Sequence, residues 1–341
     1  MKKKNILFIT SIVILLFGII TSIVYFNLFN KPFIVDKPTY IYIDEDDNID
    51  SVYIKIEENL NPKTIGGIKF LSWIQDYDKN IFTGAYKFDS ETSSLQAFRK
   101  LKSGSQTPVK LIIPSTRMID KLIGKATKQI MADSAQIMNL LKDSSYIASL
   151  GFNKETLPAL FIPNTYEVYW NMSAEGLIKR MKKEYDSYWN ENRLAKAKAI
   201  GMSPIEIATL ASIVEEETAN NAEKPIVAGL YINRLKRGIP LQADPTVKFS
   251  LKDFGLKRIL FKHLEVDSPY NTYKITGLPP GPIRIPSVTG LNSVLNYTHH
   301  NYIYMCAKED FSGTHNFAST LSQHNINARK YQQALNKRNI K

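Results

Sequence analysis

The chain has 341 residues, 44% of them hydrophobic, and a formal net charge of +12 at pH 7. This length indicates about two domains, and this composition excludes a largely disordered chain. Because Cys306 is the single cysteine, an intrachain disulfide and a cysteine-based zinc site are also excluded, and the basic charge favours anionic surroundings such as nucleic acid, a membrane surface or an acidic polymer.

An apolar segment follows three lysines at the N-terminus. It runs over 6–26 without a charged residue, which is long enough for one helix to span a bilayer. Bulky residues follow it and no A-x-A cleavage pattern is present, so an uncleaved signal anchor at 5–27 is favoured over a cleaved signal peptide. The lysines predict that the tail 1–4 is cytoplasmic. The chain would then cross the cell (inner) membrane once, with everything after the anchor extracytoplasmic.

The remaining positive charges are scattered along the chain. The densest cationic run, at 179–183, is interpreted as a solvated helix face. The sequence contains no compact basic run interleaved with aromatic residues, which is the pattern of a nucleic-acid surface. We therefore expect no nucleic-acid partner, and we expect the charge to suit an anionic polymer outside the membrane.

A linker with two prolines is predicted at 28–38, and a small α+β unit follows it at 39–114. Strand-like and helix-like patterns alternate through this unit. The expected strands are 40–43, 84–89 and 109–113, and the expected helices are 50–59, 68–76 and 93–101. About 75 residues of this kind can form an independent domain.

The rest of the chain, 115–341, is predicted to form a larger α+β domain. Helices are expected at 117–132, 134–141, 174–190, 204–218 and 222–236, and from about Thr320 onward. Ser203 and Glu206 flank the helix start at 204 in the capping-box arrangement. Between 239 and the last helix, Pro, Gly, Tyr and Asn predict strands and ordered loops.

Glu217 is the acid that the helix 204–218 places closest to its apolar stripe. At 100° per residue, Glu217 lies about 60° from the centre of the stripe, Glu215 about 100° and Glu216 about 160°. This predicts that Glu216 faces solvent. A carboxyl group beside apolar side chains is desolvated, so its pKa rises, as a general acid near neutrality requires. Two alternatives are a frayed acidic helix end and a Glu217 that pairs with Arg234.

Two later segments could line a binding site. Gln242, Asp244 and Thr246 lie in a predicted turn, and Tyr270, Asn271 and Thr272 precede a loop at 276–283 rich in Pro and Gly. Such a rigid loop is either structural or the wall of a groove, and Tyr and Asn side chains suit carbohydrate. His315 and His324 are nine residues apart without an acid nearby. A structural or substrate-contact role is therefore favoured over metal binding.

These segments together resemble the YceG-like endolytic murein transglycosylases. The resemblance is carried by the stretches 210–218, 232–235, 241–247, 270–273 and 277–283, by His315-Asn316-Phe317 and by His324-Asn325, in the family's order. It covers 160–330, and the N-terminal anchor fits the family architecture. Residues 39–114 correspond by position and pattern to a LysM-like subdomain, and 115–341 to the YceG-like catalytic domain.

The resemblance implies a function and a site. The family cleaves the bond between N-acetylmuramic acid and N-acetylglucosamine in nascent glycan strands, leaves 1,6-anhydro-muramic ends, and so could terminate glycan elongation. By the family's motif Glu217 is the catalytic acid and Glu215 a supporting residue. The substrate-binding residues would be Gln242, Asp244, Thr246, Tyr270, Asn271, Thr272, His315, Phe317 and His324. No cofactor and no metal are implied. The implied partners are peptidoglycan, the membrane and penicillin-binding proteins of elongation or division.

The reaction that the resemblance implies explains why one catalytic acid is sufficient. Most glycoside hydrolases need two carboxylates, whereas here the sugar's own 6-hydroxyl can be the nucleophile. Glu217 would protonate the leaving oxygen and then accept the proton of that hydroxyl. Two alternatives differ in class: a catalytically inactive peptidoglycan-binding scaffold of the synthesis machinery, and a metal-dependent amidase or peptidase. Neither the type of cell envelope nor the glycan product length follows from the sequence.

Overall fold

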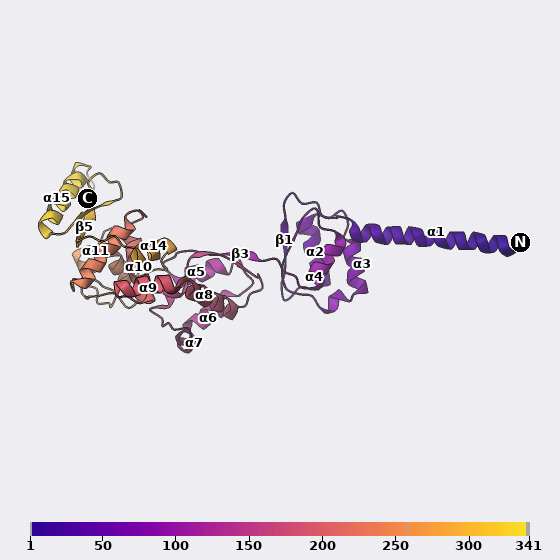
Figure 1. Cartoon of the computed structure of the whole chain (residues 1–341), viewed down its shortest axis with the longest axis horizontal. Helices are drawn as coiled ribbons and strands as arrows, with labels where there is room; N and C mark the ends of the chain where they lie inside the picture. The colour runs from indigo at the N-terminus through magenta and orange to yellow at the C-terminus, as the bar shows by residue number, and fades with distance from the viewer. Residues whose placement is uncertain (1, 257, 339–341) are drawn as a thin grey trace. The chain divides into compact units, whose positions relative to one another are not determined.

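The computed structural model describes residues 2–256 and 258–338 and divides into two compact units. The first unit holds the chain up to Leu111 together with 129–131 and 167–172, and the second holds the rest. Helices dominate, with three two-stranded sheets in the described residues (Figure 1). The predicted α+β class is confirmed. The predicted limits 28–38, 39–114 and 115–341 stay predictions.

The first unit begins with a long apolar helix. Helix α1 (Lys2–Phe29) contains the segment Ile6–Phe29, whose mean hydropathy is 2.7 and whose side chains are not buried. Of the helices in the described part of the chain, α1 alone is long and apolar enough by itself to cross a membrane. It reaches two residues beyond the predicted anchor.

The remainder of the first unit is a hairpin of strands packed on helices. Strands β1 (Thr39–Ile43) and β2 (Gly84–Phe88) pair antiparallel, with Thr39 opposite Phe88. Their inward side chains share one core with three helices. These helices are α2 (Ile49–Leu60), α3 (Gly66–Ile74) and α4 (Ser94–Lys102), joined by a 3₁₀ turn, η1 (Tyr77–Lys79). Each predicted strand and helix of this region is present to within about two residues.

The second sheet pairs β3 (Val109–Ile113) with β4 (Asn164–Val168), and the division between the units falls within both strands. The predicted helix at 117–132 is shorter than expected, since α5 (Ile119–Ala126) ends before an irregular stretch. The other elements between the two strands are α6 (Ser134–Lys142), α7 (Ser144–Ser149) and η2 (Leu157–Leu160).

The second unit is built around α10 (Pro204–Glu217). Its start is as predicted, because the amide of Ser203 donates to Oε2 of Glu206 and the amide of Glu206 to Oγ of Ser203. Every residue from Ile207 to Val214 is buried. Helices α11 (Lys224–Lys236), α12 (Asp244–Leu251) and α14 (Val288–Leu295) pack against α10. Figure 1 shows α10, α11 and α14 in one part of the second unit. The core of this unit therefore surrounds the helix that ends at Glu217.

The remaining elements of the second unit flank this core. They are α8 (Ala174–Tyr188), α9 (Glu191–Ile200), α13 (Phe261–Leu264), β5 (Tyr304–Ala307), β6 (His315–Ala318) and α15 (Leu321–Lys337). Strands β5 and β6 pair antiparallel, with Ala307 opposite His315. Thr320 caps α15, at the position where the sequence predicts the last helix to begin.

Candidate active site

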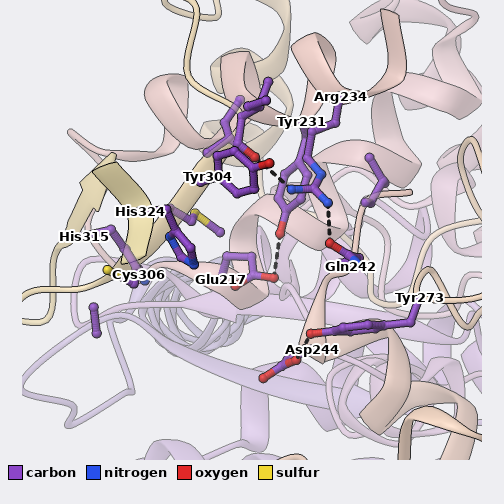
Figure 2. A pocket seen from close by; sticks show the side chains of 15 residues that line it. Glu217, Tyr231, Arg234, Gln242, Asp244, Tyr273, Tyr304, Cys306, His315 and His324 are labelled. Atoms are coloured by element: carbon purple, nitrogen blue, oxygen red, sulfur yellow. Dashed lines mark hydrogen bonds between the residues drawn. The ribbon is translucent and has the colours of Figure 1, made fainter. Parts of the chain in front are cut away.

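A cavity of about 330 Å³ in the second unit is lined by side chains from several helices, loops and strands. Glu217, at the end of α10, lies in its wall (Figure 2). Tyr231 and Arg234 reach it from α11, Asp244 from the start of α12 and Tyr273 from the loop after α13. The β5–β6 hairpin contributes Tyr304, Cys306 and His315, and Gln242 and His324 complete the polar lining.

The carboxyl group of Glu217 is half-buried and has one direct polar partner in the described residues. The Tyr231 hydroxyl donates a 2.7 Å hydrogen bond to Glu217 Oε1. Burial raises the pKa of Glu217 to about 7, and the bond from Tyr231 opposes this effect without cancelling it. Burial also raises the pKa of Tyr231, which keeps its proton available for donation. The arrangement can hold a protonated carboxyl group at neutral pH.

Arg234 does not neutralise Glu217. Its guanidinium donates to the carbonyl oxygens of Pro240 and Ile303, each at 2.8 Å, and to Oε1 of Gln242 at 2.5 Å. Burial lowers the pKa of Arg234. Among residues 2–256 and 258–338, Glu217 has no ion-pair partner within 4.0 Å, so the alternative of a Glu217–Arg234 pair is not observed.

The three consecutive acids occupy three environments. Glu216 is not the solvent-facing residue that the helical wheel predicts, because Arg117 and Arg284 both donate to its carboxylate at 2.6–2.8 Å. Glu215 Oε2 accepts from the amide of Ser287 at 2.7 Å, which ties the end of α10 to the first residue before α14. Only Glu217 of the three lines the cavity.

His315 is held by a buried carboxylate that the sequence analysis missed. Glu223 is 6% exposed. It accepts from the backbone amide of His315 at 2.7 Å and lies 2.8 Å from its Nδ1. The same carboxylate accepts from the hydroxyl of Thr218, the residue after Glu217. Glu223 therefore links the segment that follows Glu217 to a histidine of the cavity wall.

His324 stacks on Tyr304, with ring centroids 5.2 Å apart. Burial lowers the pKa of His324, and the positive charge of Arg234 lowers it further. Figure 2 shows His315 and His324 on one side of Glu217, and Gln242, Asp244 and Tyr273 on the other. Within the described part of the chain, no group of three or more His, Cys, Asp or Glu side chains is arranged to hold a metal ion.

Asp244 is the acceptor of a 2.6 Å hydrogen bond from Tyr273, and its charge contributes to the raised pKa of Glu217. The predicted turn around Asp244 is instead the first turn of α12, with Pro245 near its start. Proline disrupts a helix interior but fits the first turn, so the same residues are compatible with either structure.

Five of the predicted substrate-binding residues lie outside the cavity lining. Thr246, Asn271 and Thr272 are fully buried. The Thr246 and Thr272 hydroxyls share a hydrogen bond, Thr272 also accepts from the amide of Ala243, and Asn271 donates to the carbonyl oxygen of Leu264. We expect these three to hold the cavity wall, since they offer no surface to a substrate. Tyr270 packs on Phe249, and Phe317 stacks on Tyr302.

The residues missed by the sequence analysis are Tyr231, Tyr273, Tyr304 and Glu223, together with the Glu216–arginine cluster. Tyr273 falls inside the stretch 270–273 that carries the family resemblance, so its position in that stretch could have indicated it. Tyr231 comes 14 residues after its partner, and His315 comes 92 residues after Glu223. No local spacing rule connects residues that far apart.

Comparisons with known proteins give the same family throughout. Residues 41–330 match the model of the YceG-like family. The chain is 36% identical over 222 residues to an endolytic murein transglycosylase of Bacillus subtilis, which covers 62% of this chain and 60% of that protein. It is 27% identical over 255 residues to an endolytic murein transglycosylase of Streptococcus pneumoniae, which covers 66% of this chain and 46% of that protein.

The alignments thus span less than two thirds of either curated relative. Among solved structures, a yceG-like protein of Listeria monocytogenes is similar with a TM-score of 0.57 and 26% sequence identity. That match covers 86% of this chain and 99% of the Listeria chain.

Proposed function

The chain belongs to the YceG-like family, and from this premise we propose that it is a membrane-anchored endolytic murein transglycosylase. The activity is that for which its curated relatives are named. The observation that carries the proposal is the half-buried carboxyl group of Glu217 in the cavity wall, whose pKa is raised to about 7. A group balanced near neutrality can donate a proton and later accept one.

The proposed reaction moves one proton through Glu217. Because Oε1 accepts from Tyr231, the proton of the neutral carboxyl group belongs on Oε2, from which it passes to the glycosidic oxygen. The bond between C1 of N-acetylmuramic acid and that oxygen breaks, and the N-acetylglucosamine side leaves with a hydroxyl group. The 6-hydroxyl oxygen of the same muramic residue then bonds to C1, and its proton returns to the Glu217 carboxylate. The product is a 1,6-anhydro end, with no water consumed.

The surrounding side chains are proposed to bind the glycan. Gln242, Asp244, His315 and His324 line the cavity together with the aromatic faces of Tyr273 and Tyr304. Flat aromatic faces and hydrogen-bonding tips suit sugar rings. We retain Glu215 as a supporting residue, because its bond to Ser287 fixes the end of α10.

The reaction is tested with the full chain in detergent, acting on uncrosslinked glycan strands, with products identified by mass spectrometry. Wild type is expected to release anhydro-ended muropeptides, and Glu217→Gln none. Glu175→Gln is the matched control, because its exposed pair with Lys179 lies on α8. Anhydro ends at the wild-type rate from Glu217→Gln would refute the assignment.

The same assay separates the alternatives. A scaffold without activity gives no product from the wild-type chain. A metal-dependent amidase or peptidase releases peptides, and a chelator stops it, whereas transglycosylation through Glu217 continues with chelator present. The single carboxyl group poised near neutrality favours the transglycosylase.

The membrane topology belongs to the proposal. Helix α1 would anchor the chain, with its N-terminus in the cytoplasm. The LysM-like unit 39–114 and the catalytic domain 115–341 would lie outside. Nascent glycan strands and penicillin-binding proteins would be their partners there. Cleavage of nascent strands there would terminate their elongation. Alkaline phosphatase fused after the last residue is expected to be active, because that enzyme needs an oxidising compartment. An inactive fusion protein of normal abundance would show that the C-terminus lies in the cytoplasm and would refute the proposed topology.

A further inference from the structure

Helix α3 of the first unit exposes an apolar face, although its other face is packed in the core. Ile68 and Leu71 belong to the core of the unit. On the other side Phe70, Trp73 and Ile74 are 38%, 77% and 53% exposed. Because they recur at spacings of three and four residues, they form one stripe along the helix, here called the α3 apolar face. A short helix that is apolar on both faces requires a second apolar environment.

The start of α3 lies against the end of α1, within the same unit. A Cβ atom added at Gly67 would lie 2.2 Å from the carbonyl oxygen of Asn27, so only glycine allows this approach. Leu28, at the end of α1, packs against the core that α3 shares. Figure 1 shows α3 on the side of the first unit at which α1 enters.

Helix α1 carries exposed apolar side chains up to its end. Tyr25, Phe26 and Phe29 are 64%, 67% and 51% exposed, and the apolar segment Ile6–Phe29 ends two residues beyond Asn27. If α1 crosses a membrane, the start of α3 lies at the depth where the hydrocarbon core ends.

We propose that the α3 apolar face inserts into the interfacial layer of the membrane that α1 crosses. Trp73 is the side chain expected there, because indole combines a large apolar surface with a polar N–H and prefers the headgroup level. Helices with apolar residues on one exposed face bind in this layer. The proposal depends on the proposed anchor α1 but is independent of the proposed chemistry at Glu217.

The charges beside α3 fit phospholipid headgroups. Lys63 and Lys69 line a hollow of about 430 Å³ at the start of the helix, together with Glu57. Glu57 lies 3.6 Å from Lys69, and Lys63 has no ion-pair partner within 4.0 Å among the described residues. One positive charge therefore remains available to an anionic phosphate.

The test is fluorescence of the full chain reconstituted in vesicles of phosphatidylglycerol and phosphatidylcholine. The chain has three tryptophans, so the difference between wild type and Trp73→Phe isolates the emission of Trp73. Because this side chain is mostly exposed, Phe should leave the fold intact, which circular dichroism checks. Lipids brominated near the headgroup end of the acyl chains are expected to remove about half or more of the difference emission. Lipids brominated near the chain ends should remove less, and aqueous iodide almost none.

Other results would overturn the proposal. Strong quenching by iodide without quenching by brominated lipid would show that the α3 apolar face is exposed to water. Protection from both quenchers means that a second copy or another protein covers it. Alkaline extraction of the same vesicles tests α1 separately. Release of both wild type and Trp73→Phe would refute the anchor. Retention of both, with Trp73 exposed to water, would refute only the insertion of α3.

Discussion

The Tyr231 hydroxyl and the Glu217 carboxyl group form a 2.7 Å hydrogen bond that joins α11 to the last residue of α10. This bond stabilises the ionised carboxylate, whereas burial of the group favours its neutral form. Burial is the larger effect, and the resulting pKa is about 7. Two opposing effects of the fold therefore hold Glu217 where both of its protonation states are populated near neutral pH.

Removal of the Tyr231 hydroxyl should raise the pKa of Glu217 further. In Tyr231→Phe the carboxylate loses the donor that stabilises it, so the upper limb of the pH–rate profile should move to higher pH. The rate at neutral pH should nevertheless fall about tenfold. The carboxylate that forms when Glu217 gives up its proton loses one hydrogen bond, and a hydrogen bond to a charged group contributes about this much. Formation of anhydro ends between pH 5 and 9 measures both effects. An unshifted profile would show that the bond does not tune the acid.

Because the pKa of Glu217 is raised, both the reaction rate and the free energy of unfolding should decrease as pH rises. The rate should fall as pH rises above about 7, because the acid loses its proton. Between the ordinary value of 4.5 and about 7, the folded chain holds a proton that the unfolded chain releases. The free energy of unfolding therefore decreases as pH rises through this window.

Glu217→Gln should abolish this loss of stability along with the activity. At pH 8 we expect the variant to be more stable than wild type by about 1–3 kcal/mol. Below pH 4.5 the difference should vanish, because wild type is then neutral in both states. Thermal unfolding of both proteins at pH 4 and pH 8 measures the effect. A variant that is less stable at pH 8 would contradict the burial of a neutral acid.

Glu216 should matter for stability, because two guanidinium groups depend on it. Its side chain is 11% exposed and that of Arg284 18%, so Glu216→Gln leaves a mostly buried cation without its counter-charge. The expected loss is about 2–4 kcal/mol in urea unfolding. The control Glu175→Gln breaks a pair whose side chains are more than half exposed, and it should cost less than about 0.5 kcal/mol. Equal effects of the two substitutions would show that the Glu216 cluster is incidental.

Glu223 should act through His315. Glu223→Gln removes the charge beside Nδ1 of His315, so the imidazole loses the partner that orients it in the cavity wall. We expect kcat/KM to fall about 10–100-fold. His315→Gln should have a similar effect, and the double variant should be no worse than either single one. Additive losses would indicate that the two residues act separately.

The start of α10 was predictable because the capping box is a local signal. Ser203 and Glu206 lie three residues apart, and their reciprocal bonds depend on nothing else in the fold. The caps of α4 at Ser93 and of α15 at Thr320 have the same local character. Elements with such ends were placed to within one or two residues.

The environment of the three acids was not predictable from the helix alone. A helical wheel assumes one buried stripe, but α10 is buried around its whole circumference from Ile207 to Val214. The position of Glu216 is decided by Arg117 and Arg284, which are 99 and 68 residues away along the chain. Tertiary partners of this kind leave no trace in local periodicity. The helical wheel therefore distinguished Glu217 from its neighbours, but it wrongly predicted that Glu216 faces solvent.

Cys306 lies on β5 in the wall of the cavity, and it is the one thiol of the sequence. Burial and the charge of Glu309 raise the pKa of this thiol, so it reacts slowly at neutral pH and faster in mild alkali. A fluorophore or spin label on a maleimide can therefore be attached at a single position without any substitution. A glycan bound as proposed would lie beside the sulfur, so the alkylation rate of the wild-type chain would then report on the occupancy of its cavity.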